Sequence, residues 1–405
     1  MTEDRKTIPA GGLPLAGIRV LDFGRVIAAP RAARYLADLG ADVIHIEHPE
    51  AGDETRADPY DFGHGLSGAF LQENWGKRSI ALDLKHPRAM EILTPLIGRA
   101  DIVLENFRPG VMQRLGLGYE QLSVINPAII MCSISGFGQQ STSPSGSYGF
   151  IADAIAGFPE LTGEADGPPV PSPLPVADVM GSALAFGLIS AALFERTRSG
   201  RGRQIDLSLL DAAFAAHDMA LQVHLSSGGA EHPTRRGSND PMRVPFGYFE
   251  CQDGWICLMC GADRQWEALR RLMGEHGARL AAGMTLRQRQ AAQEEIYGSI
   301  GAWVAGFASA TELATLLENA GVPATRLNTV ADAATDPRVL ARRLIETVDH
   351  PTIGSVRIQN LLGPNADPRS TRPAPLLGEH TREIAEEAGL DGAEIDALFA
   401  ARCLR

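Results

Sequence analysis

The stretch LAGIRVLDFGRVIAAPRAARYLADLGADVIHIEHP, residues 15–49, alternates the patterns of two kinds of secondary structure. Residues 17–24 have the composition of a buried β-strand, and residues 30–40 that of a helix that ends at Gly40. Residues 41–49 return to the pattern of a strand. A helix between two strands is the repeating unit of a parallel β-sheet, so this stretch predicts such a sheet.

The alternation continues through the next ninety residues or so. Residues 78–84 read as a strand, residues 87–100 as a helix with a proline at its start, and residues 101–107 as a further strand. Residues 128–138 add another strand. We therefore expect an α/β fold, with a doubly wound, mostly parallel, Rossmann-like sheet in a large domain.

The pattern changes near residue 225. A polar, glycine-containing stretch at 226–242 is typical of a linker, and residues 244–261 predict a hairpin followed by helical segments. Because 405 residues exceed what one hydrophobic core usually serves, we expect two domains. The predicted boundaries are 1–225 for the first part of the large domain, 226–325 for a linker and a smaller α+β domain, and 326–405 for a return linker and the rest of the large domain.

Composition narrows the functional class. A formal net charge of −12, without a basic stripe, argues against nucleic acid as a partner. No charge-free apolar run reaches the roughly 18 residues that a membrane-spanning helix needs, and the first dozen residues lack the apolar core of a signal peptide. We expect a soluble cytoplasmic protein with no membrane contact, in which five cysteines, an odd number, stay reduced.

Two pairs of potential metal ligands have unsuitable spacing. The pairs are Cys257 with Cys260, and His45 with His48. Each pair lies three residues apart on a predicted strand, where such side chains point to opposite faces of the sheet. The sequence therefore predicts no metal site.

Several motifs occur in order along nearly the whole chain. They read VLDFGRVIAAP, NWGKRSIALDL, ENFRPGVMQRLGLGYE, SISGFGQ, VADVMGS and RPAPLLGEHT. Together they resemble the class III CoA-transferase family, which includes formyl-CoA transferase, carnitine CoA-transferase and the related α-methylacyl-CoA racemases. The resemblance implies a coenzyme A (CoA) thioester and a small carboxylic acid as substrates, with no permanently bound cofactor. It also implies that the large domain binds CoA and that two chains form an interlocked, ring-like homodimer.

The resemblance also implies roles for individual residues. Asp178, in VADVMGS, matches the nucleophile of the transferases. The positions that match the CoA site are Val26, Ile27 and Ala28 beside the pantetheine, Lys77 near the adenosine phosphate, Asn106, Phe107, Arg108 and Arg114 in the segment that binds CoA, Tyr148 beside the aspartate, and His48. Formyl-CoA transferase has glutamine in place of Ile27 and arginine in place of His48, and Gly149 stands where an acidic residue is usual. Oxalate-type chemistry is therefore not implied.

The residues themselves support a phosphate site. CoA carries a 3′-phosphate and a pyrophosphate, so an acidic protein must gather positive charge locally to bind it. Lys77, Arg78, Arg108 and Arg114 lie where the loops of an alternating fold would bring them together. Arginine is suited to bidentate contact with phosphate.

Asp178 has two compatible interpretations. It directly precedes an apolar run that begins near Val179, so it is a good candidate for the N-cap of a helix, where the helix dipole favours the ionised form. An ionised carboxylate is also what a nucleophile requires. We expect backbone N–H groups at this helix start and near Gly237 to stabilise oxyanions.

Two alternatives and one refinement remain open. A racemase of this family pairs the aspartate with a histidine, but no histidine occurs between His86 and His217. A CoA-binding protein that has lost its chemistry is the second alternative, and the presence of Asp178 argues against it. If the chain is a transferase, Arg235, Arg236 or Arg243 is a candidate to pair with the second carboxylate of a dicarboxylic acid.

Overall fold

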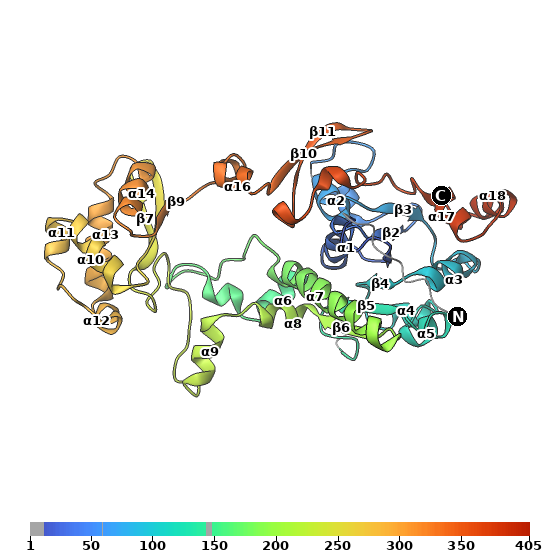
Figure 1. The fold of residues 1–405 in the computed structure, drawn as a ribbon. Coiled ribbons are helices and arrows are strands. Elements are labelled where there is room, and N and C mark those ends of the chain that lie inside the picture. The colour runs from blue at the N-terminus through green and yellow to red at the C-terminus, as the bar shows by residue number, and fades with distance from the viewer. Residues whose placement is uncertain (1–11, 59, 143–147) are drawn as a thin grey trace. The chain divides into compact units, whose positions relative to one another are not determined.

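The computed structural model describes residues 12–58, 60–142 and 148–405, which form two compact units. Unit 1 comprises the chain up to Ala156 together with Leu174–Asp218 and Pro337–Arg405. Unit 2 comprises Gly157–Pro173 and Met219–Asp336. The chain therefore leaves unit 1 and returns to it twice (Figure 1).

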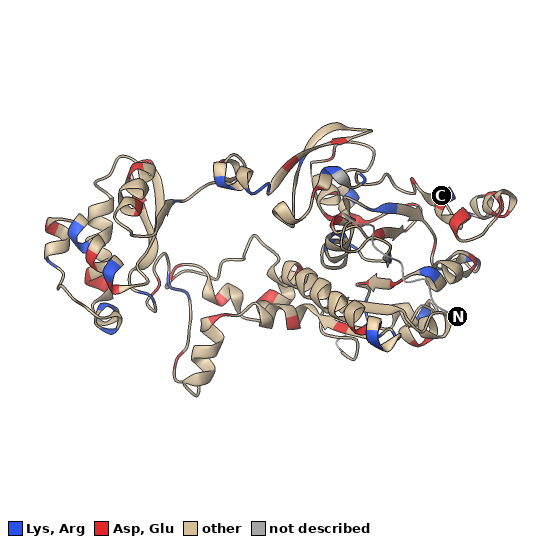
Figure 2. Cartoon of the chain, in the orientation of Figure 1, with Lys and Arg blue, Asp and Glu red and all other residues tan. Residues whose placement is uncertain are grey.

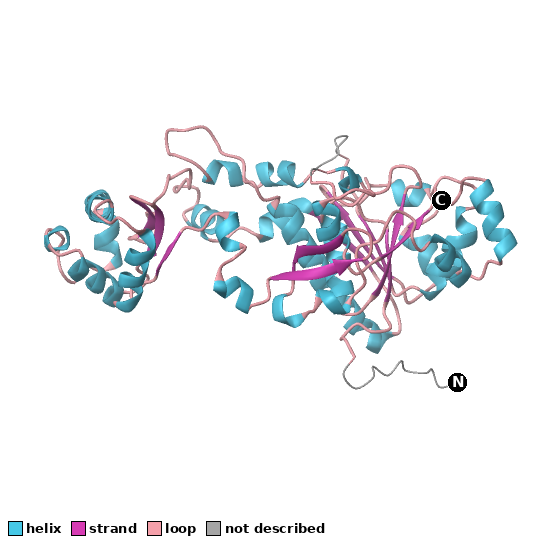
Figure 3. Ribbon diagram, turned by 90° about the horizontal axis from the view of Figure 1, so that it is seen from above, coloured by secondary structure: helices cyan, strands magenta, loops and turns pink. Residues whose placement is uncertain are grey.

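Unit 1 is built on a six-stranded sheet in the order β3-β2-β1-β4-β5-β6, and all of its pairings are parallel. The strands are β1 (Arg19–Asp22), β2 (Asp42–Glu47), β3 (Arg78–Ala81), β4 (Ile102–Glu105), β5 (Ile130–Ser135) and β6 (Gln204–Ser208). Seen from above, the strands form a twisted sheet with helices on both sides (Figure 3). The predicted doubly wound, Rossmann-like sheet is confirmed, and its strand order reverses between β1 and β4.

Helices cover both faces of this sheet. The helices of unit 1 are α1 (Ala28–Asp38), α2 (Gly68–Asn74), α3 (Ala89–Arg99), α4 (Val111–Arg114), α5 (Tyr119–Ile125), α6 (Gly149–Ile155), α7 (Val176–Ser199), α8 (Leu209–Ala215), α16 (Pro337–Ala341), α17 (Thr381–Glu387) and α18 (Gly392–Ala400). On one face, side chains of α3, α5, α17 and α18 pack with Leu21, Ile44 and Val103 in a buried core. On the other face, α1 and α7 pack against each other and against strands.

Alternation along the strands places polar residues under α1. Leu21 and Phe23 lie in the core on the α3 side, so Asp22 between them points to the opposite face. Asp22 is paired in register with His45 of β2, and both side chains are almost completely buried. The sheet therefore carries two titratable groups inside its α1-covered face.

Helix α7 is long and apolar. Most of its length is drawn in tan in Figure 2, because its charged residues lie near its two ends. By length and composition it is apolar enough to cross a membrane, but it packs against α1, α6, α8 and strands β5 and β6. A core helix of a soluble protein meets the same criterion. The absence of membrane contact stays a prediction.

The C-terminal segment returns to unit 1 as a hairpin and two helices. Strands β10 (Ile345–His350) and β11 (Gly354–Gln359) pair antiparallel. Val348, Val356 and Ile358 pack on Trp75 and its neighbours in a small buried cluster. The segment 326–405, predicted to return to the large domain, thus supplies a strand pair and two helices to unit 1 from Pro337 onward.

Unit 2 has a three-stranded antiparallel sheet and its own core. Its strands are β7 (Phe246–Cys251), β8 (Gly254–Met259) and β9 (Ala324–Arg326), so the predicted hairpin is confirmed. Its helices are α9 (Met219–Ser226), α10 (Asp263–Leu272), α11 (Glu275–Ala278), α12 (Leu286–Ala291), α13 (Gln293–Val304), α14 (Ala310–Asn319) and α15 (Val330–Ala333). Trp266, Ile300 and Leu317 are among the buried residues of the core.

The unit boundaries differ from the predicted domain boundaries in two respects. The main segment of unit 2 runs over Met219–Asp336 rather than 226–325. Residues 157–173 belong to unit 2, although the sequence shows no linker on either side of them. Thr234 and Arg235 explain their placement, because both side chains bind Glu160. These contacts are long-range in sequence and leave no local pattern.

Candidate active site

Asp178 lies in the first turn of α7 but does not cap it. The helix begins at Val176, two residues before the aspartate. The carboxylate of Asp153, on α6, accepts hydrogen bonds from the N–H groups of Val176, at 3.1 Å, and Ala177, at 2.9 Å. Asp153 therefore performs the capping that the sequence assigns to Asp178, and the carboxylate of Asp178 is left for other contacts.

The carboxylate of Asp178 sits against the start of α6. The backbone N–H of Gly149 donates a hydrogen bond to it. A Cβ atom at position 149 would lie 2.0 Å from Asp178 Oδ2, so a side chain there would displace the carboxylate. Glycine at this position therefore permits a close backbone approach to Asp178.

The environment raises the pKa of Asp178 to about 6. Burial is the largest cause and the neighbouring carboxylate of Asp153 adds to it, while Arg31 and the Gly149 N–H oppose it. The sequence predicts that the helix N-terminus favours the ionised form of Asp178. The raised pKa shows that burial and Asp153 outweigh that effect. The group is still ionised at neutral pH, and an ionised carboxylate that is only partly compensated is suited to nucleophilic attack.

Arg31 links Asp178 to α1 and α2. Its guanidinium makes a two-pronged ion pair with Glu73, with Nε–Oε2 and Nη2–Oε1 distances of 3.0 and 2.5 Å. Both side chains are largely buried. Because Glu73 partly neutralises Arg31, the arginine compensates the charge of Asp178 incompletely.

Sequence reasoning missed four residues of this site. They are Arg31, Glu73 and Asp153, together with Gly149 as a donor. Arg31 directly follows the motif VLDFGRVIAAP, so of the four it was the easiest to find from the sequence. The other three come from segments that only the folded chain brings to Asp178.

The loop between β1 and α1 carries three of the predicted CoA contacts. Val26 has a φ of +65°, a left-handed backbone conformation that is rare for a β-branched residue. Ile27 is half-buried and precedes the first residue of α1. Ala28 is almost completely buried as a whole residue, so little of it is left to meet a ligand.

Asn106 and Phe107 lie at the end of β4, beside the same loop. The side chain of Asn106 accepts a hydrogen bond from Arg25 N–H and donates one to Arg25 C=O, both at 2.8 Å. The guanidinium of Arg25 lies 5.0 Å from the centre of the Phe107 ring. Asn106 therefore satisfies backbone groups of a distant loop rather than of its own turn.

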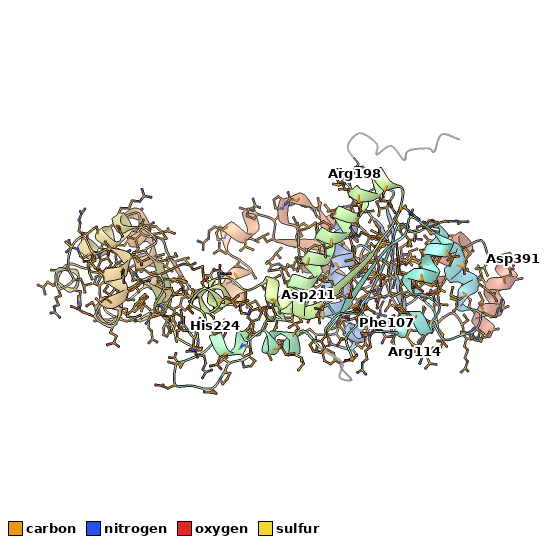
Figure 4. All side chains as sticks on the ribbon, turned by 90° about the horizontal axis from the view of Figure 1, so that it is seen from below. Phe107, Arg114, Arg198, Asp211, His224 and Asp391 are labelled. Atoms are coloured by element: carbon orange, nitrogen blue, oxygen red, sulfur yellow. The ribbon has the colours of Figure 1, made fainter. Side chains whose placement is uncertain are left out.

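Arg108 and Arg114 are the exposed cations of this region. Neither makes an ion pair within the described residues, and Figure 4 labels Arg114 on the segment that also carries Phe107. Gly110, with a φ of +80°, lets the Arg114 guanidinium lie close over the backbone. Both arginines are exposed and so accessible to a ligand, and their contact with CoA stays a prediction.

Lys77 and Arg78 are not placed as predicted. The ammonium of Lys77 is fully buried and contacts Asp22 Oδ2 and Asn74 Oδ1, each at 2.8 Å. Arg78 is buried among the carboxylates of Asp42, Glu383 and Glu387. Both cations are paired with carboxylates inside the fold. The prediction that Lys77 and Arg78 bind phosphate is therefore wrong.

Tyr148 and His48 lie at the ends of elements. Tyr148 precedes α6, is largely exposed, and is the direct neighbour of the Gly149 N–H that binds Asp178. His48 follows β2, is exposed, and its Nδ1 accepts the N–H groups of Glu50 and Ala51. His48 thus stabilises its own turn.

The expected oxyanion donors are already engaged. The N–H of Gly237 donates to Gly163 C=O at 2.9 Å, and the first N–H groups of α7 are bound by Asp153.

The arginines proposed for the second carboxylate of the acid also have partners. In unit 2, Arg235 pairs with Glu160 at 2.6 Å, and Arg236 lies 3.8 Å from Asp240. The Gly237 N–H, the first N–H groups of α7 and Arg235 would each have to give up a close partner to act as predicted, whereas the contact of Arg236 is longer.

The described residues contain neither a disulfide nor a cluster of potential metal ligands. All five cysteines are unpaired, and burial raises the pKa of the Cys260 thiol to about 12. Among the residues that the structure describes, no group of three or more potential ligands gathers in a way that suits a metal ion.

Comparison with known proteins now identifies the family. A model described as CoA-transferase family III matches residues 15–381. The chain belongs to this family. It is an enzyme, and it transfers CoA between acyl groups.

Individual relatives agree with this assignment. The chain is 37% identical over 395 residues to a succinate–glutarate CoA-transferase of Agrobacterium fabrum, an alignment that covers 92% of this chain and 95% of the relative. It is 35% identical over 391 residues to a succinyl-CoA:mesaconate CoA-transferase of Haloarcula marismortui, covering 93% and 97%. A crystal structure of a CaiB/BaiF family protein from Brucella suis superposes with a TM-score of 0.79 at 32% identity, covering 93% of this chain and all of that one.

Proposed function

We propose that Asp178 is the nucleophile of a CoA transfer between dicarboxylic acids. Its carboxylate attacks the thioester carbonyl of the acyl-CoA donor, forming an acyl-aspartyl anhydride and releasing CoA thiolate. The thiolate attacks the aspartyl carbonyl, which releases the first acid and leaves an aspartyl-CoA thioester. The acceptor carboxylate attacks that thioester, and the released thiolate attacks the new acyl group, which restores Asp178.

The environment of Asp178 carries this proposal. A carboxylate with a pKa of about 6 is ionised at neutral pH and is a better nucleophile than one with an ordinary pKa. Arg31 lies near enough to lower that pKa, so a cation accompanies the carboxylate without neutralising it completely. Covalent catalysis of this type requires no metal or redox cofactor, and CoA takes part as a substrate.

Relatives support a dicarboxylic acid as acceptor. Proteins named for succinate, glutarate, mesaconate and L-malate are 34–37% identical to this chain over more than nine tenths of its length. We propose succinyl-CoA or a related dicarboxylyl-CoA as donor and a C4 or C5 dicarboxylate as acceptor.

A transfer assay tests the substrate class. Purified protein is incubated with succinyl-CoA and each of a panel of mono- and dicarboxylic acids, and new CoA esters are measured by mass spectrometry. Transfer only to monocarboxylic acids would contradict the dicarboxylate proposal.

A second assay tests the racemase alternative. The enzyme is incubated in deuterated water with a chiral 2-methylacyl-CoA and no acceptor, and a racemase would introduce deuterium at the α-carbon.

Of the candidates Arg235, Arg236 and Arg243, we propose Arg236 as the residue that binds the second carboxylate. Arg235 is held by Glu160 at 2.6 Å, whereas Nη1 of Arg236 lies 3.8 Å from Oδ1 of Asp240. We expect Arg236→Ala to raise the KM of the dicarboxylate acceptor and to leave the KM of the donor unchanged. Arg235→Ala is the matched control, and an equal effect of both variants on acceptor and donor would contradict the assignment.

We also propose that the chain acts as a homodimer. Helices α6, α7 and α8 contact one another and expose large apolar side chains. These are Phe150, Ile151, Ile155, Leu188, Phe194 and Phe214. Light scattering coupled to size exclusion should give the mass of two chains, and an active monomer would contradict the proposal.

The remaining expectations concern partners and location. We propose a cytoplasmic enzyme whose partners are its acyl-CoA, its acid and a second copy of itself, with no nucleic acid and no membrane. The net charge of −12 supports the exclusion of nucleic acid. Fractionation of the source cells tests the location.

A further inference from the structure

The turn between β1 and α1 contains a residue in an unfavourable backbone conformation. Val26 has a φ of +65°, which brings the Cβ of a β-branched residue close to its own backbone. A non-glycine residue holds such a conformation only where its surroundings enforce it. The contacts of this turn show what enforces it.

The turn is held from two sides. From the residue that follows β4, the Asn106 side chain binds both backbone groups of Arg25 at 2.8 Å. From the segment after β2, Oδ2 of Asp53 accepts the N–H of Val26 at 3.2 Å. Because the Asp53 bond is made to Val26 itself, it acts directly on the strained residue.

Asp53 is itself firmly positioned. Its Oδ1 accepts the N–H and the hydroxyl of Thr55, at 2.8 and 2.6 Å, and its own N–H donates to Glu47 at 3.0 Å. The side chain is almost completely buried. These bonds leave Oδ2 pointing to Val26 and to the ring of His45, whose Nε2 is 3.7 Å away.

A buried chain of charges continues from Asp53 under the sheet. Nδ1 of His45 lies 3.1 Å from Oδ2 of Asp22, and Lys77 donates to the same oxygen at 2.8 Å. The other oxygen of Asp22 accepts the N–H of Gly24 at 2.8 Å. The network therefore reaches the turn at two points, Gly24 and Val26.

The charges of this network support its rigidity. Burial lowers the pKa of His45, but Asp22 and Asp53 outweigh it and raise the pKa to about 9. At neutral pH the imidazolium thus lies between two carboxylates, and Lys77 supplies a second cation to Asp22. Opposite charges that are fully paired resist rearrangement, because removing one partner leaves a buried charge uncompensated.

We propose that Asp53 is a positioning residue for the acyl-CoA donor, which holds the β1–α1 turn in the left-handed conformation at Val26 and so shapes the loop beside the thioester. This inference rests on the proposed function and on the contacts with CoA that the family resemblance implies for Val26 and Ile27. Lys77 then has a role that differs from phosphate binding, because it anchors the network behind the turn. Asp53 touches no reacting atom in this account.

The first test is Asp53→Asn in the full-length enzyme. The amide can present an NH2 group to the Val26 N–H, where a carboxylate oxygen stood, so the turn should relax. We expect the KM of the acyl-CoA donor to rise about tenfold, with the acceptor KM and kcat little changed. Glu54→Gln is the matched control, because Glu54 is the exposed neighbour and pairs with the Arg25 side chain rather than with Val26. It should leave the donor KM unchanged.

Rescue distinguishes positioning from general stability. Glycine adopts positive φ at no steric cost, so Val26→Gly in the Asp53→Asn background should restore most of the lost donor affinity. Val26→Pro should reproduce the defect of Asp53→Asn with Asp53 intact, because proline excludes positive φ and has no N–H. This second variant alters an element of the surface turn, so it tests the proposal even if Asp53→Asn fails to fold.

Three results would overturn the inference. They are an unchanged donor KM in Asp53→Asn, an unchanged donor KM in Val26→Pro, or a double variant that is no better than Asp53→Asn. Hydrogen exchange at residues 23–27 needs no substrate and should be faster in Asp53→Asn than in the wild type. If the wild type transfers no CoA, the proposed function fails, while the exchange experiment still decides whether Asp53 holds the turn.

Discussion

Asp22 and Asp178 are both aspartates of unit 1, the first fully buried and the second half-buried, and their surroundings shift the carboxyl pKa in opposite directions. Burial opposes the charge of Asp22, but Lys77 and His45 hold its pKa well below the usual range. For Asp178, burial and Asp153 together outweigh Arg31, and the pKa rises to about 6. The charge of Asp22 is fully compensated by its partners, whereas the charge of Asp178 is only partly compensated and the carboxylate stays reactive.

The difference lies in what each cation is paired with. Lys77 directs its ammonium to Asp22 and to the neutral side chain of Asn74. Arg31 directs its guanidinium to Glu73, so little of its charge is left for Asp178. A fully compensated buried carboxylate stabilises a fold, whereas a partly compensated one is a candidate for chemistry.

Asp178→Asn should give the largest effect. Transfer activity should fall by at least about 10⁴-fold, because an amide is a poor nucleophile. At neutral pH the variant should be more stable than the wild type by roughly 1–3 kcal/mol, since it removes a poorly compensated buried charge. Steady-state assays and urea unfolding measure the two quantities, and a less stable variant would break the comparison.

The pH dependence of stability sharpens the same point. The pKa of Asp178 is about 6 in the folded chain and 3.8 in the reference state, so between these values the folded chain binds more protons. This group therefore reduces the free energy of unfolding as pH rises from about 4 to 6. Asp178→Asn should lack that loss, which parallel unfolding curves at several pH values would show.

Lys77→Met should give the next largest effect, on stability. It leaves Asp22 buried with His45 as its remaining charged partner, and we expect a loss of about 3–5 kcal/mol. Lys85→Met is the matched control, because Lys85 is exposed and its loss should cost less than about 0.5 kcal/mol. Equal losses in the two variants would show that Lys77 is not the anchor described above.

Asp153→Asn should give the smallest effect, a displaced pH profile. The wild-type kcat/KM for the donor should fall as pH drops through about 6, where Asp178 takes up a proton. Removing the Asp153 charge lowers the pKa of Asp178, so this acid limb should move to lower pH. The asparagine oxygen can still accept one N–H of α7, which limits the loss of stability. An unmoved acid limb would contradict the electrostatic role of Asp153.

The sheet could be predicted from the sequence because strand and helix periodicities are local. Residues 17–24 and 41–49 contain β1 and β2, and the helix predicted at 30–40 is observed at Ala28–Asp38. The strand order could not be derived from those patterns. It depends on which connections cross the sheet, and only the structure shows the order β3-β2-β1-β4-β5-β6.

The site was predicted only in part. Asp178 was found by its motif, but the helix start was placed three residues late and Asp153 was missed. Lys77 was assigned to phosphate because it matches a basic residue of the family's CoA site and lies in a loop of the alternating fold. Its partner Asp22 lies 55 residues earlier, and only the pairing of strands brings the two together.

The covalent role of Asp178 is the central claim, and trapping the enzyme's intermediate tests it most directly. Wild-type enzyme is mixed with the acyl-CoA donor without acceptor, hydroxylamine is added, and peptides are analysed by mass spectrometry. The account predicts a hydroxamate on the peptide that contains Asp178, and none in enzyme that has not met the donor. A modification on another peptide, or no modification in enzyme that is actively transferring CoA, would contradict it.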